Sequence, residues 1–106
     1  MAHKVKWSEK SKDDLVRIID YLIDNWGRNS AKIFKKTVLQ TIDLILTVPT
    51  IYPLTEYREN VRRCVVVKQV SMYYQINEDA KEFYIVRFYD NRRYPDSIPN
   101  ELKENE

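Results

Sequence analysis

Three residue types that small proteins often use for chemistry are nearly absent from this sequence, which has one glycine, one cysteine and one histidine in 106 residues. A single glycine excludes the glycine-rich loops that hold phosphate groups, and a single cysteine excludes an intramolecular disulfide. Because His3 and Cys64 are not spaced as ligands, we expect neither a metal site nor another cofactor. Cys64 lies in a run of valines, where we expect a small buried side chain.

Long apolar segments are absent as well. No run approaches the roughly 18 residues of a membrane span, and the N-terminal residues lack the apolar core of a signal peptide. We therefore expect a cytoplasmic protein with no membrane partner. The length corresponds to one domain, which is large enough to bury a core without disulfides.

The charge is unevenly distributed along the chain. Residues 1–95 contain 17 Lys and Arg against 12 Asp and Glu, whereas residues 96–106 contain one against four. The body is therefore +5 and the tail −3, which gives the net charge of +2. The excess is smaller than in a dedicated DNA-binding domain. We predict a single domain over 1–95 and an acidic, loosely ordered tail over 96–106.

The first part of the sequence predicts a short strand and a helix. Val5 and Trp7 alternate with lysines, as in a strand with one buried face. Ser8 is a suitable N-cap for a helix, and Gly27 fits a left-handed C-cap. Between them the apolar residues recur with helical spacing and form one stripe: Leu15, Ile18, Ile19, Leu22 and Trp26.

A second helix is predicted to begin directly after Ser30, which is a suitable N-cap residue, and to end at Pro49. The connection from the first helix is about three residues long, so the two helices should fold back as an antiparallel hairpin. The apolar stripe of this helix is formed by Ala31, Phe34, Val38, Thr41, Ile42, Ile45 and Val48.

In the second half the apolar spacing becomes alternating. After an irregular segment at 49–60 we expect strands at 62–69, 70–76 and 82–89, with a turn at 77–80. The last strand is apolar on both faces, which favours a central place in the sheet. We expect one face to carry Tyr84, Val86 and Phe88, and the other to carry Phe83, Ile85, Arg87 and Tyr89.

The predicted element order is β-α-α-β-β-β. We expect an α+β fold with an N-terminal strand and an antiparallel helix hairpin packed on an antiparallel sheet. The first strand should join this sheet at an edge or beside the last strand. Two pairs of adjacent carboxylates, Asp13-Asp14 and Glu78-Asp79, are interpreted as solvated charges at a helix start and in a turn.

Arginines and tyrosines gather in the sheet half of the chain. If Tyr74 faces the helices, then Ser71, Tyr73 and Gln75 face away, and Arg87 and Tyr89 can share that open face. Arginine binds phosphate or carboxylate and tyrosine can stack, so this face could bind a partner. The simpler interpretation is a set of ordinary cross-strand pairs. The whole set is Arg58, Arg62, Arg63, Tyr73, Arg87, Tyr89, Arg92, Arg93 and Tyr94.

An ordered series of short patterns resembles the RelE/ParE toxin superfamily of bacterial type II toxin–antitoxin pairs. The patterns are Asp14-Leu15-x-x-Ile18-x-Asp20-Tyr21, Ile45-Leu46-x-x-Pro49, Val61-Arg62-Arg63, Tyr73-Tyr74-Gln75-Ile76 and Ile85-Val86-Arg87-x-x-Asp90-x-Arg92-Arg93-x-Pro95. The resemblance covers roughly residues 4–96 and favours the ParE-like branch. The fold that it implies agrees with the element order predicted above.

The resemblance implies a toxin that inhibits growth by binding DNA gyrase and that is neutralised by a cognate antitoxin in a possible hetero-oligomer. We accordingly expect a binding protein rather than an enzyme. The partner-binding residues that we predict are Arg62, Arg63, Tyr73, Arg87, Tyr89, Arg92 and Arg93.

Two alternatives stay open. A RelE-like toxin would cut mRNA on the ribosome, with Arg92, Arg93 and Tyr94 as the candidate catalytic residues. RelE-like toxins also place an essential arginine early in the strand that here reads Val70 to Tyr74, where this chain has no cation. The second alternative is a protein-binding module without toxicity.

Overall fold

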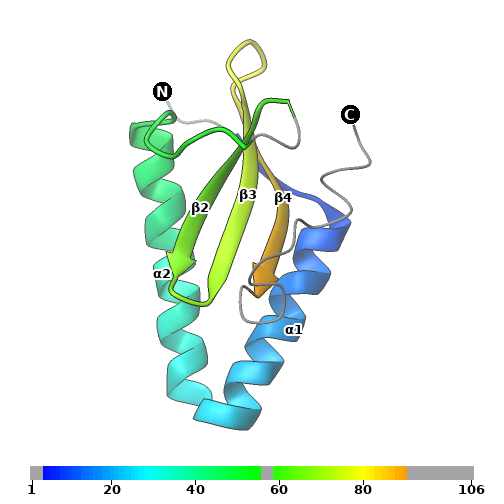
Figure 1. The fold of residues 1–106 in the computed structure, drawn as a ribbon, viewed down its shortest axis with the longest axis vertical. Coiled ribbons are helices and arrows are strands. Elements are labelled where there is room, and N and C mark those ends of the chain that lie inside the picture. Colours follow the sequence, from blue (N-terminus) through cyan, green and yellow to red (C-terminus); the bar gives the residue numbers. More distant parts are fainter. Residues whose placement is uncertain (1–3, 56–58, 91–106) are drawn as a thin grey trace.

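The computed structural model describes residues 4–55 and 59–90. The element order is the predicted one: β1 (Lys4–Trp7), α1 (Glu9–Trp26), α2 (Arg28–Thr47), β2 (Val61–Val67), β3 (Val70–Asn77) and β4 (Glu82–Asp90). The helices form a hairpin that lies against the sheet, and its tip extends beyond the ends of the strands (Figure 1). The predicted tail at 96–106 lies outside the described residues.

The sheet has the strand order β1-β4-β3-β2. The meander from β2 to β4 is antiparallel, as expected. β1 joins beside the last strand, one of the two predicted places, but it runs parallel to β4, so the sheet is mixed rather than wholly antiparallel. The parallel pairing follows from the two intervening helices, which return the chain to the same end of the sheet.

The two helix stripes are buried against one face of the sheet, α1 over β4 and α2 over β2. The core at this interface includes Phe34, Ile45, Met72, Tyr74 and Phe83, each at most 3% exposed. Cys64 is fully buried there, as predicted. Trp26, the last residue of the first stripe, is 65% exposed. No helix among the described residues is long and apolar enough to cross a membrane.

The helix ends differ partly from the prediction. Ser8 caps α1, because its hydroxyl accepts a hydrogen bond from the Ser11 backbone N–H at 2.9 Å. Gly27 has the expected positive φ, 93°, with ψ at 168°. This single residue connects the helices, so the predicted three-residue connection and the Ser30 cap were wrong. Ser30 lies inside α2 and donates to the carbonyl oxygen of Trp26.

A β-bulge in β4 changes which side chains share a face. Tyr73 pairs with Arg87, but Tyr74 pairs with Ile85, so Val86 is an extra residue in the ladder. An extra residue shifts every later side chain by one position. Phe83, Ile85 and Phe88 therefore all face the helices, and the strict alternation predicted for this strand was wrong.

Candidate partner-binding face

The sheet face opposite the helices carries a small aromatic cluster with arginines around it. Its buried centre is Val61, Tyr73 and Val86, and Tyr84 and Tyr89 pack against it. Arg63 pairs across the ladder with Tyr73 and is exposed. We use the name open-face cluster for Arg63, Tyr73, Arg87 and Tyr89. The structure thus brings together four of the seven predicted partner-binding residues.

The rings and the guanidinium of this cluster contact one another directly. Tyr73 and Tyr89 meet edge to face, with ring centroids 5.8 Å apart. The Arg87 guanidinium carbon lies 4.8 Å from the centroid of the Tyr89 ring. Such a cation–π contact stabilises the arginine and fixes the plane of its fork. The cluster is therefore an ordered surface with aromatic edges.

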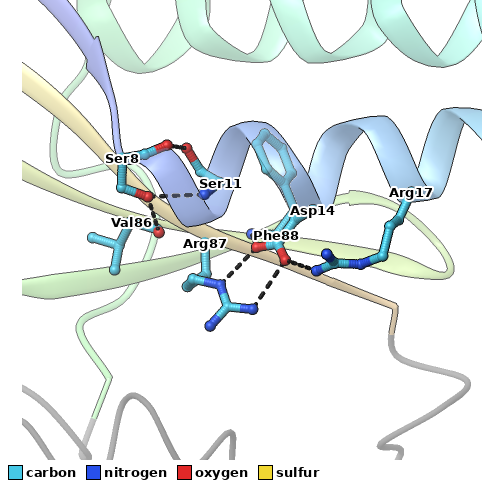
Figure 2. A network of polar contacts seen from close by, with 7 residues as sticks. All are labelled: Ser8, Ser11, Asp14, Arg17, Val86, Arg87 and Phe88. Atoms are coloured by element: carbon cyan, nitrogen blue, oxygen red, sulfur yellow. Dashed lines mark hydrogen bonds and ion pairs between the residues drawn. The ribbon is translucent and has the colours of Figure 1, made fainter.

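Arg87 is held from its other side by Asp14 of α1 (Figure 2). The two guanidinium nitrogens Nε and Nη2 donate to the carboxylate oxygens at 2.7 and 2.9 Å. The Phe88 backbone N–H donates to the same carboxylate at 3.1 Å, and Arg17 contacts it as well. Asp14 is 3% exposed and Arg87 11%, so this is a largely buried ion pair.

Ser8 continues this contact along the edge of β4. The Ser8 hydroxyl donates to the Val86 carbonyl oxygen at 2.7 Å, and the Ser8 N–H donates to the Ile85 carbonyl oxygen at 3.0 Å. β1 ends at Trp7, opposite Ile85, so within residues 4–55 and 59–90 no strand lies beside the edge of β4 beyond this point. The start of α1 satisfies the edge groups in place of a strand.

Asp14 is the main residue of the site that the sequence prediction missed, because it was interpreted as solvated. The signal was present: Ser11, Asp14 and Ile18 follow one another at i, i+3 and i+7, so the carboxylate lies on the buried side of α1. The patterns that carried the family resemblance also contained both partners. Asp14 and Arg87 stand in two separate patterns, and the structure shows that they bind each other.

Arg62 lies on the other face of the sheet. It pairs with Tyr74, which belongs to the helix-side core, and its Nη1 donates to the Tyr52 carbonyl oxygen at 2.6 Å. Tyr52 and Cys64 share a hydrogen bond beside it, and burial raises the pKa of the Cys64 thiol. The predicted residues Arg58, Arg92, Arg93 and Tyr94 lie outside the described residues.

A second candidate site is a groove of about 300 Å³ at the tip of the helix hairpin. Its lining is mainly apolar and includes Tyr21, Trp26, Ile33 and Phe34, with the end of β4 at one side.

The open-face cluster and this groove both suit binding. No group of metal-binding side chains occurs among the described residues.

Comparisons with known proteins identify a family and similar folds. Residues 5–95 match the family described as the ParE toxin of the type II toxin–antitoxin system parDE. No curated protein matches the chain. A structure of the chromosomal ParDE system from P. aeruginosa is 18% identical, with a TM-score of 0.68 over 83% of this chain and 95% of that one.

Two further solved structures share the fold. The toxin–antitoxin complex RelBE2 from Mycobacterium tuberculosis is 14% identical, with a TM-score of 0.58 over 85% of this chain and 99% of that one. A metal-bound toxin from Helicobacter pylori is 15% identical, also with a TM-score of 0.58, over 86% and 97%. At these identities the likeness is one of fold.

Proposed function

Because the chain belongs to the ParE toxin family of type II toxin–antitoxin systems, we propose that it inhibits bacterial growth by binding DNA gyrase and that a cognate antitoxin neutralises it. The observation that carries this proposal is the family match over residues 5–95. The open-face cluster supports a binding role, since its side chains suit contact with a partner.

The composition of β3 differs from that of a RelE-like ribonuclease. β3 lies in the middle of the meander, and it contains no arginine or lysine. A ribonuclease needs cations to stabilise the negative charge that develops on the phosphate. On this strand, where RelE-like toxins place an essential arginine, the open-face side carries the buried Ser71 and Tyr73 and the half-buried Gln75 instead.

Induced expression in bacteria tests the proposal. We expect growth to stop, plasmid DNA to lose its negative supercoiling, and co-expression of the antitoxin to reverse both effects. Arrested cells with fully supercoiled plasmid would contradict gyrase as the target. Cuts in mRNA on arrested ribosomes, detected by toeprinting, would instead establish the ribonuclease. Normal growth on induction would leave a binding module without toxicity.

A further inference from the structure

The outer flank of α2 carries a row of cations. Arg28, Lys32, Lys35 and Lys36 stand at i, i+4, i+7 and i+8, which places them on one face of the helix. All four residues are exposed. Within the part of the chain that the structure describes, none of them forms an ion pair. We use the name α2 basic stripe for these four residues.

Five of the ten Lys and Arg residues outside the stripe, counted over the described residues, form ion pairs with other described residues, and what distinguishes the stripe is that four cations without such a pair share one helix face. The ion pairs between described residues are Lys6–Glu82, Lys12–Glu9, Arg17–Asp14, Lys81–Glu78 and Arg87–Asp14. In α2 the only acidic residue is Asp43, three turns or so beyond the centre of the stripe. The sequence therefore places four positive charges on one helix face, with no carboxylate of α2 within one turn of them.

This arrangement is unfavourable in the isolated protein. The first turn of α2 has no acidic residue, and the stripe begins there, at the positive end of the helix dipole. Cations four residues apart, such as Arg28 and Lys32, also repel each other. A bound anionic partner would offset both the unfavourable interaction with the helix dipole and the repulsion between the cations. This is a physical reason to expect such a partner.

The side chain next in line indicates the class of partner. Leu39 stands at i+11 from Arg28, on the same face as the stripe, and is 61% exposed. A phosphate backbone offers nothing that would cover an exposed leucine, whereas a protein segment with acidic and apolar residues can do so. The combination of four cations with Leu39 therefore fits an acidic protein segment better than nucleic acid.

We propose that the α2 basic stripe docks an acidic segment of the cognate antitoxin, with an apolar side chain of that segment over Leu39. The identity of the partner rests on the proposed function. α2 packs on one face of the sheet and the open-face cluster lies on the other. The stripe is thus a second contact region, and an antitoxin that wraps around the toxin reaches both.

Charge reversal with a matched control tests this assignment. The stripe variant carries Lys32→Glu, Lys35→Glu and Lys36→Glu; the control carries Lys4→Glu, Lys10→Glu and Lys68→Glu, at exposed residues outside α2. Both variants have the same net charge. The probe is the purified cognate antitoxin, titrated by calorimetry at low and high salt. Circular dichroism confirms that both variants are folded.

We expect the stripe variant to raise the antitoxin Kd by at least about tenfold at low salt and the control to change it far less. We also expect the salt dependence of Kd to be weaker in the stripe variant, because fewer charges are paired on binding. Equal effects of the two variants would overturn the proposal while leaving the proposed function intact. Failure of the unmodified toxin to bind the antitoxin would overturn both.

Two further binding measurements test whether the partner is an acidic protein segment with an apolar residue or a nucleic acid. Leu39→Ser should weaken antitoxin binding, whereas Val16→Ser, at a residue of similar exposure on α1, should not. An unchanged affinity with Leu39→Ser would overturn the apolar part of the contact. A DNA duplex is titrated in parallel; a stripe variant that loses DNA binding but keeps full antitoxin affinity would assign the stripe to nucleic acid instead.

Discussion

A single carboxylate, that of Asp14, connects the first helix to the last strand. It accepts hydrogen bonds from the Arg87 guanidinium and from the Phe88 backbone, and both donors lie in β4. Removing one member of a buried ion pair leaves the other charge uncompensated. Asp14 therefore fixes the position of α1 on the sheet and, through Arg87, the shape of the open-face cluster.

Replacing this carboxylate should destabilise the protein strongly. We expect Asp14→Asn to lower the free energy of unfolding by about 3 kcal/mol, because Arg87 loses its charged partner in a site that is nearly closed to water. The control is Asp13→Asn at the neighbouring, exposed residue, which should change stability by less than about 0.5 kcal/mol. Urea unfolding measures both, and similar midpoints for the two variants would contradict this role of Asp14.

Tyr74 leads to a prediction about alkaline pH. Its hydroxyl is buried without a hydrogen-bond partner among the described residues, and burial raises its pKa above the ordinary value of 10.0. The folded protein therefore keeps a proton that the unfolded chain releases. The contribution of the protonated Tyr74 to the free energy of unfolding is fully present below about pH 10. It is lost as the pH rises toward the pKa of Tyr74 in the folded protein.

Tyr74→Phe separates this titration from packing, since it removes only the hydroxyl. We expect the variant to be at least as stable as the unmodified protein at neutral pH, because a buried hydroxyl without a partner is unfavourable. Above about pH 10 its stability should fall less steeply. Urea unfolding at a series of pH values measures this, and parallel curves for the two proteins would refute it.

At the scale of elements, the helix hairpin depends on Gly27 as its one-residue connection. The combination of φ at 93° and ψ at 168° is a backbone region that only glycine adopts readily. Among the described residues, leaving aside Gly27 itself and the adjacent backbone, no atom lies within 4 Å of the position that a Cβ would take, so a side chain would meet no obstacle from more distant parts of the chain. The cost of any substitution is therefore backbone strain.

We expect Gly27→Ala to lower stability by about 1–3 kcal/mol, since alanine must adopt this strained conformation or shift the hairpin. Asn29→Ala, two residues away in α2, is the control and should be neutral or slightly stabilising, because alanine favours a helix. Thermal unfolding compares the two variants. A hairpin that tolerates Gly27→Ala without loss would show that the connection can change its conformation freely.

The open-face cluster leads to a prediction about antitoxin binding. Arg63 is the exposed member of the open-face cluster, whereas Arg87 cannot test binding alone, since it also holds the fold. We expect Arg63→Glu to weaken antitoxin binding by about tenfold with unchanged stability. Arg62→Glu on the opposite face is not a clean comparison, because Arg62 donates to the backbone. Lys10→Glu in α1 is the control, and equal affinities would remove the open face from the interface.

At the scale of the whole molecule, the sequence was sufficient for the element order, the helix stripes and the neighbouring places of Tyr73, Arg87 and Tyr89. Periodicity reports these features because each depends on the local spacing of apolar residues. The bulge at Val86, the parallel pairing of β1 and the buried pair of Asp14 with Arg87 depend on contacts between distant segments. Spacing within one segment can place Asp14 on the buried side of α1, but it does not identify Arg87 as its partner, nor the bulge, nor the direction of β1.

Inhibition of purified DNA gyrase tests the central claim most directly. Gyrase is assayed on relaxed plasmid with increasing toxin, with and without an excess of the antitoxin, and with a type I topoisomerase reaction as the control. We predict that the toxin alone blocks supercoiling in a dose-dependent manner, that the antitoxin restores it, and that the control enzyme is unaffected. Full supercoiling at a large excess of folded toxin would contradict the proposed function.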